Sequence, residues 1–397
     1  MKRFLPAVFG ILYFVIPVFP AFITLTIVTV PGVSLLPTPL TLAVLALCAV
    51  MAAYAIAAIL LKPREPVPML VPLAVWWGAC LISLLLGFDP LGGALFLAIF
   101  GLNVVWHAFI VRFYRYPGVA LSLYRAYLLS GALASVAAVL MVLTKVPAAQ
   151  YTVGHGRAIG TFILPGEFAG YLIVYLPLAF AVSRFTTRRD LRIYAIGGLV
   201  TGTVAFLMTF SRAGWMGMAA AVAFLVFTQM RRWRLRSAVA VIAVAIGAVF
   251  LVFNFHHNPS ENYTRLSIWQ SAVQMFLRFP LTGVGAFAFE RVYPLVRLPD
   301  GEPTAFHAHS YLLTFAAELG VLGLGAVAFC WWRFIVLLRR SIAAATPANA
   351  ALALAVAAGL LGTWVQGLID TVTVVIFALW MPFMAVALCC AQDGLVE

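Results

Sequence analysis

Long apolar runs recur along the whole 397-residue chain and limit its possible folds more than any other feature. Each run holds about 20 residues, which is enough for an α-helix to cross the hydrocarbon core of a bilayer. Charged residues make up only 9% of the chain, whereas soluble globular domains contain about a quarter. The sequence therefore predicts an all-α, polytopic membrane protein that forms a single integral membrane domain over residues 1–397. We place about twelve spans, at 7–28, 39–61, 67–87, 92–110, 121–143, 167–183, 193–210, 214–230, 237–254, 309–335, 350–367 and 372–390.

The net charge of +13 would suggest a nucleic-acid partner in a soluble protein, but its distribution has a simpler explanation. With these spans, 18 of the 25 basic residues fall on one side of the membrane. Basic residues are enriched in cytoplasmic loops, so both termini are expected in the cytoplasm and no nucleic acid is expected as a partner. These residues are Lys2, Arg3, Lys62, Arg64, Arg112, Arg115, Arg125, Arg184, Arg188, Arg189, Arg192, Arg231, Arg232, Arg234, Arg236, Arg333, Arg339 and Arg340.

The opposite side carries the remaining cations, and topology does not explain them. Each is therefore a candidate for function, although a simple solvated loop charge remains an equal alternative for Arg291 and Arg297. The full set is Lys145, Arg157, Arg212, Arg265, Arg278, Arg291 and Arg297.

Residues 144–166 form the first outer loop with candidate chemistry. Three glycines flank His155 and Arg157, and glycine lets a backbone approach a ligand closely. Arg157 could then supply a planar fork of donors to a phosphate, or the loop could be a flexible surface segment. Glu167 lies where the following span opens.

Arg212 lies in the short segment TFSRAGWMGM, between two apolar runs. A cation near the membrane boundary is costly unless it has a partner. An anionic lipid headgroup is one candidate partner, and the alternative is a structural arginine that caps helix carbonyls.

The long outer loop at 255–308, between spans nine and ten, is the predicted catalytic loop. Its segment 264–279 has the spacing of an amphipathic helix, with an apolar stripe and a face rich in Ser and Gln. Such a helix is expected to lie at the membrane interface rather than to span it. We place Thr264 at the N-cap and Arg265 at the N-terminus, where backbone donors favour an anion. Arg278 would lie about 20 Å further along the helix.

His309 begins the next apolar segment and is the predicted general base. An imidazole titrates near neutrality, and the following span would fix its position. Asp300, Glu302 and Glu318 are nearby in sequence, but nothing pairs one of them with this histidine. His307 is expected to point elsewhere, because two residues are far from a full helical turn.

Three segments resemble the bacterial O-antigen ligase and polymerase superfamily of integral membrane glycosyltransferases, of the GT-C type. They are GTFILPGEFAGYL, SRAGW and HSYLLTFAAELGVLG. The last is similar to the family pattern of His, then Asn, Ser or Gln, nine residues, Gly, two residues and Gly. In this chain that pattern falls on His309, Ser310, Gly320 and Gly323. The resemblance covers about 160–323.

The resemblance implies an inner-membrane enzyme of lipopolysaccharide biosynthesis, whose active site faces the periplasm. It would transfer a glycan from undecaprenyl pyrophosphate to an acceptor hydroxyl, without a metal or another cofactor. The family's essential residues fall on Arg212, Arg265 and His309. Arg157, Arg278, Glu167 and His155 are the expected substrate contacts, although Glu167 replaces a more usual Asn. The expected partners are the lipid-linked donor, the acceptor and membrane lipids.

Several functions remain open at this point. A ligase uses the lipid A core as acceptor, and we expect it ahead of a polymerase because the late loop is single and the chain is of modest length. A polymerase would use another lipid-linked glycan, and a protein O-oligosaccharyltransferase would use Ser or Thr. A transporter or lipid-linked sugar flippase would also suit about twelve spans. Transporters, however, usually place their polar sites near the bilayer midplane.

Overall fold

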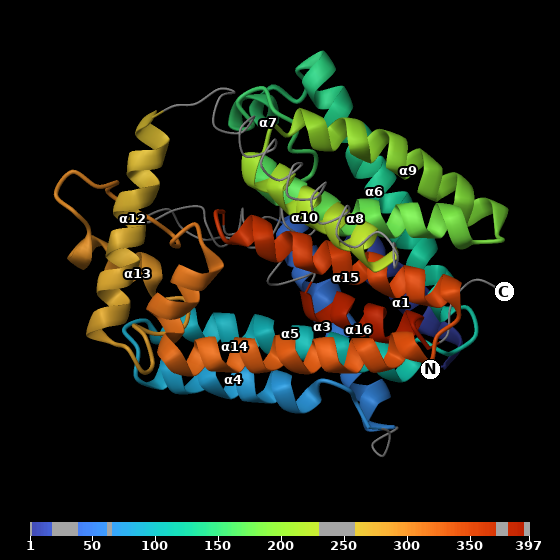
Figure 1. The fold of residues 1–397 in the computed structure, drawn as a ribbon, viewed down its shortest axis with the longest axis horizontal. Helices are drawn as coiled ribbons and strands as arrows, with labels where there is room; N and C mark the ends of the chain where they lie inside the picture. The colour runs from blue at the N-terminus through green and yellow to red at the C-terminus, as the bar shows by residue number, and fades with distance from the viewer. Residues whose placement is uncertain (1, 18–38, 62–65, 230–258, 371–379, 393–397) are drawn as a thin grey trace.

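The computed structural model describes residues 2–17, 39–61, 66–229, 259–370 and 380–392, and within these ranges all secondary structure is helical (Figure 1). The helices are η1 (Lys2–Phe4), α1 (Leu5–Val15), α3 (Pro39–Leu60), α4 (Leu70–Leu85), α5 (Pro90–Phe113), α6 (Val119–Thr144), α7 (Ala148–Val153), α8 (Pro165–Phe185), α9 (Arg189–Met208), α10 (Arg212–Gln229), α12 (Pro259–Arg278), α13 (Phe289–Val296), α14 (Tyr311–Ala343), α15 (Pro347–Gly367) and α16 (Trp380–Cys390).

Six of the described helices are long and apolar enough to cross a membrane, namely α5, α6, α8, α9, α14 and α15. Shorter apolar helices accompany them at Leu5–Val15, Ala49–Leu60, Leu70–Leu85, Arg212–Thr228 and Trp380–Cys390. The all-α, multi-pass prediction therefore agrees with the structure, but the count of twelve spans is not confirmed. The span predicted at 237–254 lies outside the described residues, as do residues 18–28 and 372–379 of two others.

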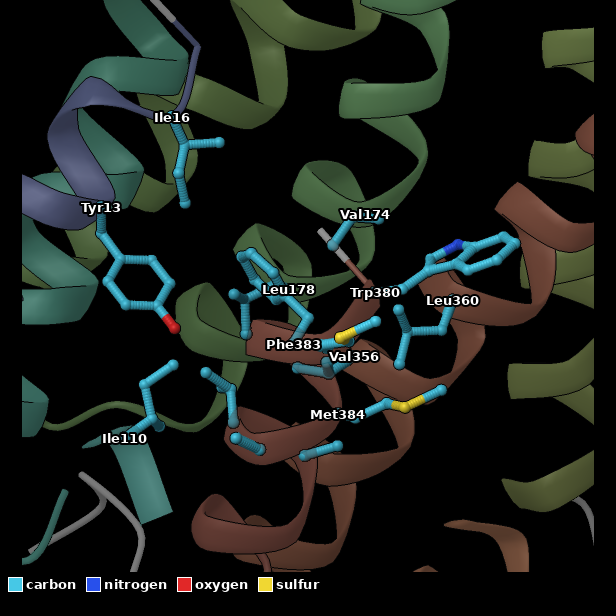
Figure 2. Packing of buried hydrophobic residues seen from close by; sticks show 14 of the residues in the cluster. Tyr13, Ile16, Ile110, Val174, Leu178, Val356, Leu360, Trp380, Phe383 and Met384 are labelled. Carbon is cyan, nitrogen blue, oxygen red and sulfur yellow. The ribbon is translucent and has the colours of Figure 1, made fainter. Parts of the chain in front are cut away.

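Helices α8 and α15 form the centre of the bundle, where α15 packs against α8, α10, α14 and α16. Small residues allow this close packing, as is usual between helices in membranes. A Cβ on Gly359 would lie 2.7 Å from the Cα of Val174, and one on Gly362 would lie 2.6 Å from the carbonyl oxygen of Gly217. Larger side chains from α1, α8, α15 and α16 fill the neighbouring core (Figure 2).

The helix ends fall into two groups, which hydrogen bonds tie together. At one end, which we call the basic end, Arg112 donates to the carbonyl of Ile59, and Arg115 to the side chain of Gln392. We call the other end the histidine end because it carries His309. There, Ala158 N–H donates to the carbonyl of Met208, and the side chain of Gln366 donates to the carbonyl of Gly166. This grouping is the one expected if alternate loops lie on opposite sides of a membrane.

Helix α12 runs crosswise over the histidine end, beside the ends of α4 and α14 (Figure 1). It packs on α13 and α14 through Ile268, Ala272 and Met275. The predicted apolar stripe, which includes Leu266 and Leu277, faces outward, since these residues are 54% and 69% exposed. The predicted polar face is instead partly inside the protein. Its members Ser267 and Ser271 are buried, and each satisfies its hydroxyl on a backbone carbonyl of the preceding turn.

Helix α14 is broken at Gly320, whose φ of 62° and ψ of −159° are not helical. The loop before α13 inserts at this break and takes up the freed backbone groups. Val321 N–H donates to the carbonyl of Pro280, and Val284 N–H donates to that of Ala317. Backbone polar groups at membrane depth must be satisfied within the protein, so this loop holds the segment 311–319 in place below His309.

Candidate active site

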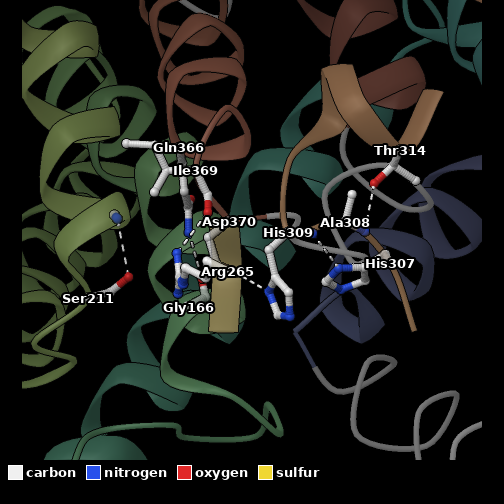
Figure 3. A network of polar contacts seen from close by, with 11 residues as sticks. Gly166, Ser211, Arg265, His307, Ala308, His309, Thr314, Gln366, Ile369 and Asp370 are labelled. Carbon is white, nitrogen blue, oxygen red and sulfur yellow. Dashed lines mark hydrogen bonds and ion pairs between the residues drawn. The ribbon is translucent and has the colours of Figure 1, made fainter. Parts of the chain in front are cut away.

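His309 and Asp370 form a side-chain pair at the histidine end (Figure 3). His309 Nδ1 lies 3.2 Å from Asp370 Oδ1, and the two side chains are 36% and 22% exposed. The pair joins the segment before α14 to the turn that follows α15. His309 does not begin the helix as expected, because α14 starts at Tyr311 and His309 has a φ of 50°. The left-handed backbone directs the imidazole toward α15.

Arg265 lies beside this pair. Its Nη1 donates a 2.8 Å hydrogen bond to the carbonyl of Ile369, the residue before Asp370 (Figure 3). The structure corrects its predicted position on the helix, because α12 begins at Pro259 and not after Thr264. Arg265 therefore lies in the second turn, away from the free N–H groups of the helix start. Its guanidinium, not the helix terminus, brings positive charge to the site.

The ionisation of Asp370 follows from these neighbours. Burial raises the pKa of the Asp370 carboxyl, but the hydrogen bond with His309 and the charge of Arg265 outweigh burial and lower the pKa below its usual value. Asp370 is therefore an anion at neutral pH and can only accept hydrogen bonds. In its neutral form, His309 therefore carries its proton on Nδ1 and presents a lone pair on Nε2.

His307 lies against His309, contrary to the prediction that it points elsewhere. The ring centroids are 4.5 Å apart, and His307 Nδ1 accepts a 3.1 Å hydrogen bond from the backbone N–H of His309. These residues lie in a loop before the helix, so helical spacing does not separate them. Burial, and then the neighbouring His309, lower the pKa of His307 to about 3. His307 is therefore neutral at physiological pH and supports the backbone of His309.

The start of α8 forms the opposite wall. A Cβ on Gly166 would lie 2.8 Å from Asp370 Oδ2, so the α8 backbone passes directly beside the carboxylate. Gln366 Nε2 donates to the Gly166 carbonyl at 2.8 Å and ties α15 to this wall (Figure 3). Glu167, the next residue of α8, is buried at 4% exposure. Glu167 therefore follows Gly166, the residue whose backbone lies against the Asp370 carboxylate.

Arg212 is the first residue of α10, and Ser211 caps that helix by accepting a 3.1 Å hydrogen bond from Gly214 N–H. Gly214 packs closely on Ala169 of α8. The N-terminus of α10 therefore lies beside that of α8, on the same end of the bundle as His309. Arg212 is partly exposed there, and a helix N-terminus favours anions.

The remaining predicted contacts differ in how near they lie to this site. The loop with Arg157 is tied to the end of α9 by a 2.9 Å hydrogen bond from Ala158 N–H to the Met208 carbonyl, close to Arg212. His155 is exposed in the same loop. Arg278 is exposed at the far end of α12, about 20 Å of helix from Arg265, so these two arginines do not meet.

Two other outer cations have structural partners. Arg291 lies 3.7 Å from Asp89, and Arg297 donates to the carbonyl of Gly301 at 3.2 Å. These contacts involve one residue of α13 and one at its C-terminal end, and neither lies at the His309–Asp370 pair.

Sequence reasoning missed Asp370 and Gln366. One signal was available, because Asp370 is a carboxylate in the short gap between the last two predicted spans, on the same side as His309.

Among the described residues, no group of three His, Cys, Asp or Glu side chains is arranged to hold a metal ion.

A family model described as O-Antigen ligase matches residues 197–329. This match confirms the resemblance to the O-antigen ligase and polymerase superfamily. The matched segment includes Arg212, Arg265 and His309, and it excludes Arg157, Glu167 and Asp370. A comparison with curated proteins found no match for the chain. The family supports an activity of the ligase or polymerase type for this multi-pass membrane protein.

Proposed function

We propose that this protein is an O-antigen ligase, which transfers a glycan from undecaprenyl pyrophosphate to a hydroxyl of the lipid A core. One observation carries this proposal: a histidine with an ionised carboxylate on Nδ1, and an arginine fixed within one residue of that carboxylate. This arrangement brings a base and a cation together, and the matched family supplies the type of reaction.

His309 is the proposed general base. Asp370 accepts a hydrogen bond from Nδ1–H and orients the ring, so Nε2 is available to remove the proton of the acceptor hydroxyl. The acceptor oxygen then forms a bond to the anomeric carbon of the donor sugar. The bond from that carbon to the pyrophosphate oxygen breaks, and the leaving pyrophosphate keeps the electron pair.

Arg265 and Arg212 are the proposed partners of the leaving group. Arginine binds phosphate oxygens through two parallel hydrogen bonds and keeps its charge at working pH. Charge that is already in place where a negative leaving group develops can be the largest catalytic contribution. Arg157, Glu167 and His155 are proposed to contact the donor from the α8–α10 side. Arg278 could contact only a distant part of a long glycan.

An apolar groove beside Arg265 suits the lipid part of such a donor. It has a volume of about 500 Å³ and lies between α12 and the first turns of α14. A polyprenyl chain there would leave the pyrophosphate beside Arg265, the neighbour of Leu266. The lining residues are Leu266, Trp269, Gln270, Val273, Gln274 and Leu313.

The proposed donor and acceptor require the histidine end to face the periplasm of the bacterial inner membrane. Reporter fusions after Ala148 and Pro259 should then show activity outside the cytoplasm. Fusions after Thr187 and Arg234 should show cytoplasmic activity. Reversal of these pairs would place the arginines on the wrong side for a periplasmic donor and would refute the proposal.

The acceptor is tested by the surface glycans of a strain that lacks this protein. For a ligase, we expect finished polymer to accumulate on the lipid carrier, with lipid A core left unmodified. Single repeats attached to the core would instead identify a polymerase, which uses the same donor. Lipid-linked glycan that stays on the cytoplasmic side would identify a flippase.

A further inference from the structure

The outer end of α15 makes an unusually close contact with α14, directly behind the His309–Asp370 pair. Gly367 is the last residue of α15, and a Cβ there would lie 1.8 Å from Tyr311 Cε2 and 1.9 Å from Cδ2. The ring of Tyr311 therefore packs on the bare backbone of Gly367. Gly367 does not have a positive φ, so the glycine is required for space and not for an unusual backbone conformation.

This contact involves residues close in sequence to both members of the pair. Tyr311 begins α14, two residues after His309, and Gly367 ends α15, three residues before Asp370. The distance between these two backbones therefore sets whether Nδ1 and Oδ1 reach each other. It also sets the position of the Ile369 carbonyl, which holds Arg265.

Tyr311 cannot easily move to make room for a larger residue. Its side chain is fully buried. The ring centroid lies 4.8 Å from that of Trp380, 5.9 Å from that of Trp364 and 6.2 Å from that of Phe315. An aromatic cluster of this kind is densely packed and transmits displacement to its neighbours.

We infer that Gly367 is a positioning residue, which with Tyr311 fixes His309 against Asp370. The inference rests on the proposed function, because it assigns Gly367 a role only through that pair. Gly367→Ala requires a shift of about 1 Å between α14 and α15, since Cβ contacts under 3.0 Å essentially never occur. A displacement of about 1 Å can cost roughly 10²-fold in rate.

The test uses the full chain, purified and reconstituted in vesicles, with undecaprenyl-pyrophosphate oligosaccharide as donor and lipid A core as acceptor. Gly367→Ala should lower turnover about 10²-fold. Gly362→Ala is the control, because it adds the same methyl group to the same helix at another close contact, 2.5 Å from Ile173 Cγ2 of α8 and 2.6 Å from the Gly217 carbonyl oxygen of α10. It should reduce thermal stability but keep the turnover of the folded protein near that of wild type.

A double-mutant cycle separates positioning from general damage. Asp370→Asn alone should lower turnover by between about 10² and 10⁴-fold. If Gly367 acts through the pair, Gly367→Ala should add little to this loss. Tyr311→Leu removes the ring without adding bulk and should also lower turnover, which keeps the test valid if Gly367→Ala does not fold.

Three results would decide against the inference or its basis. Wild-type turnover in Gly367→Ala or in Tyr311→Leu would overturn the positioning role. A loss in Gly367→Ala that adds in full to that of Asp370→Asn would also overturn it. Near-normal turnover in Asp370→Asn alone would instead refute the proposed base pair, and would leave Gly367 as a packing residue.

Discussion

Replacing His309 by alanine should lower glycan transfer by about 10²–10⁴-fold, which is the usual contribution of a positioned base. Donor binding should persist, because Arg265 is held by the Ile369 carbonyl and not by the imidazole. The measurement is single-turnover transfer in vesicles, together with the amount of donor retained by the protein. A variant that loses transfer and donor binding equally would contradict the role of base.

The pH dependence of transfer gives a second test of the role of His309 as general base. Activity should fall when the solution is made acidic, because a general base must be unprotonated to accept the proton of the acceptor hydroxyl. The lowered pKa of Asp370 keeps its carboxylate charged at neutral pH, so protonation of Asp370 would weaken the pair only at clearly acidic pH. Activity should be the same in EDTA. A loss that a divalent ion restores would replace this mechanism with a metal-assisted one.

His307 requires its own variant, because its ring touches that of His309. Asparagine at this position keeps an acceptor for the His309 N–H but removes the ring. Since the pKa of His307 is about 3, His307 does not titrate near neutrality. The His307→Asn variant should therefore show the same pH dependence of transfer as the wild-type protein near neutral pH. A loss as large as that of His309→Ala would show that the two histidines act as one structural unit.

Replacing Arg265 by alanine should lower transfer by about 10²–10³-fold, as expected when a donor to a developing anion is removed. Arg265→Lys should have an intermediate effect, because lysine keeps the charge but loses the two-pronged hydrogen bond. The change should appear in both turnover and the KM for the donor, since the arginine contacts the pyrophosphate before and during bond cleavage.

The matched control for Arg265 is Arg297→Ala. Arg297 is another outer arginine and is exposed, whereas Arg265 is partly buried. The contact of Arg297 is with the carbonyl of Gly301, four residues further along the chain. Its removal should leave transfer near the wild-type level. Equal losses in the two variants would show that transfer depends on the overall positive charge of this face and not on a phosphate contact by Arg265.

The sequence by itself determined the class of this protein and three of the candidate residues at its histidine end. Apolar runs of about 20 residues can cross a bilayer as helices, which pair every backbone polar group internally, and all secondary structure in the described residues is helical. Arg212, Arg265 and His309 stood out because cations and a titratable group between apolar runs have no topological explanation. The family match over 197–329 includes all three.

Local periodicity predicted the amphipathic helix but not which of its faces is buried. Hydrophobicity alone would bury Leu266 and Leu277, whereas the structure buries Ser267, Ser271 and Ala272. The reason is that α12 meets other helices through a mixed face of Ile268, Ala272, Met275 and the two serines. Leu266 and Leu277 remain available to a lipid environment, which a sequence pattern cannot distinguish from a protein core.

Only the tertiary structure shows which carboxylate forms a hydrogen bond with His309. Asp300, Glu302 and Glu318 are closer in sequence, yet the partner is Asp370, 61 residues away. Its position depends on where the last turn of α15 stops against α14, and that depends on the contact between Gly367 and Tyr311. Contacts of this kind are set by the packing of whole helices, and no local pattern in the chain specifies them.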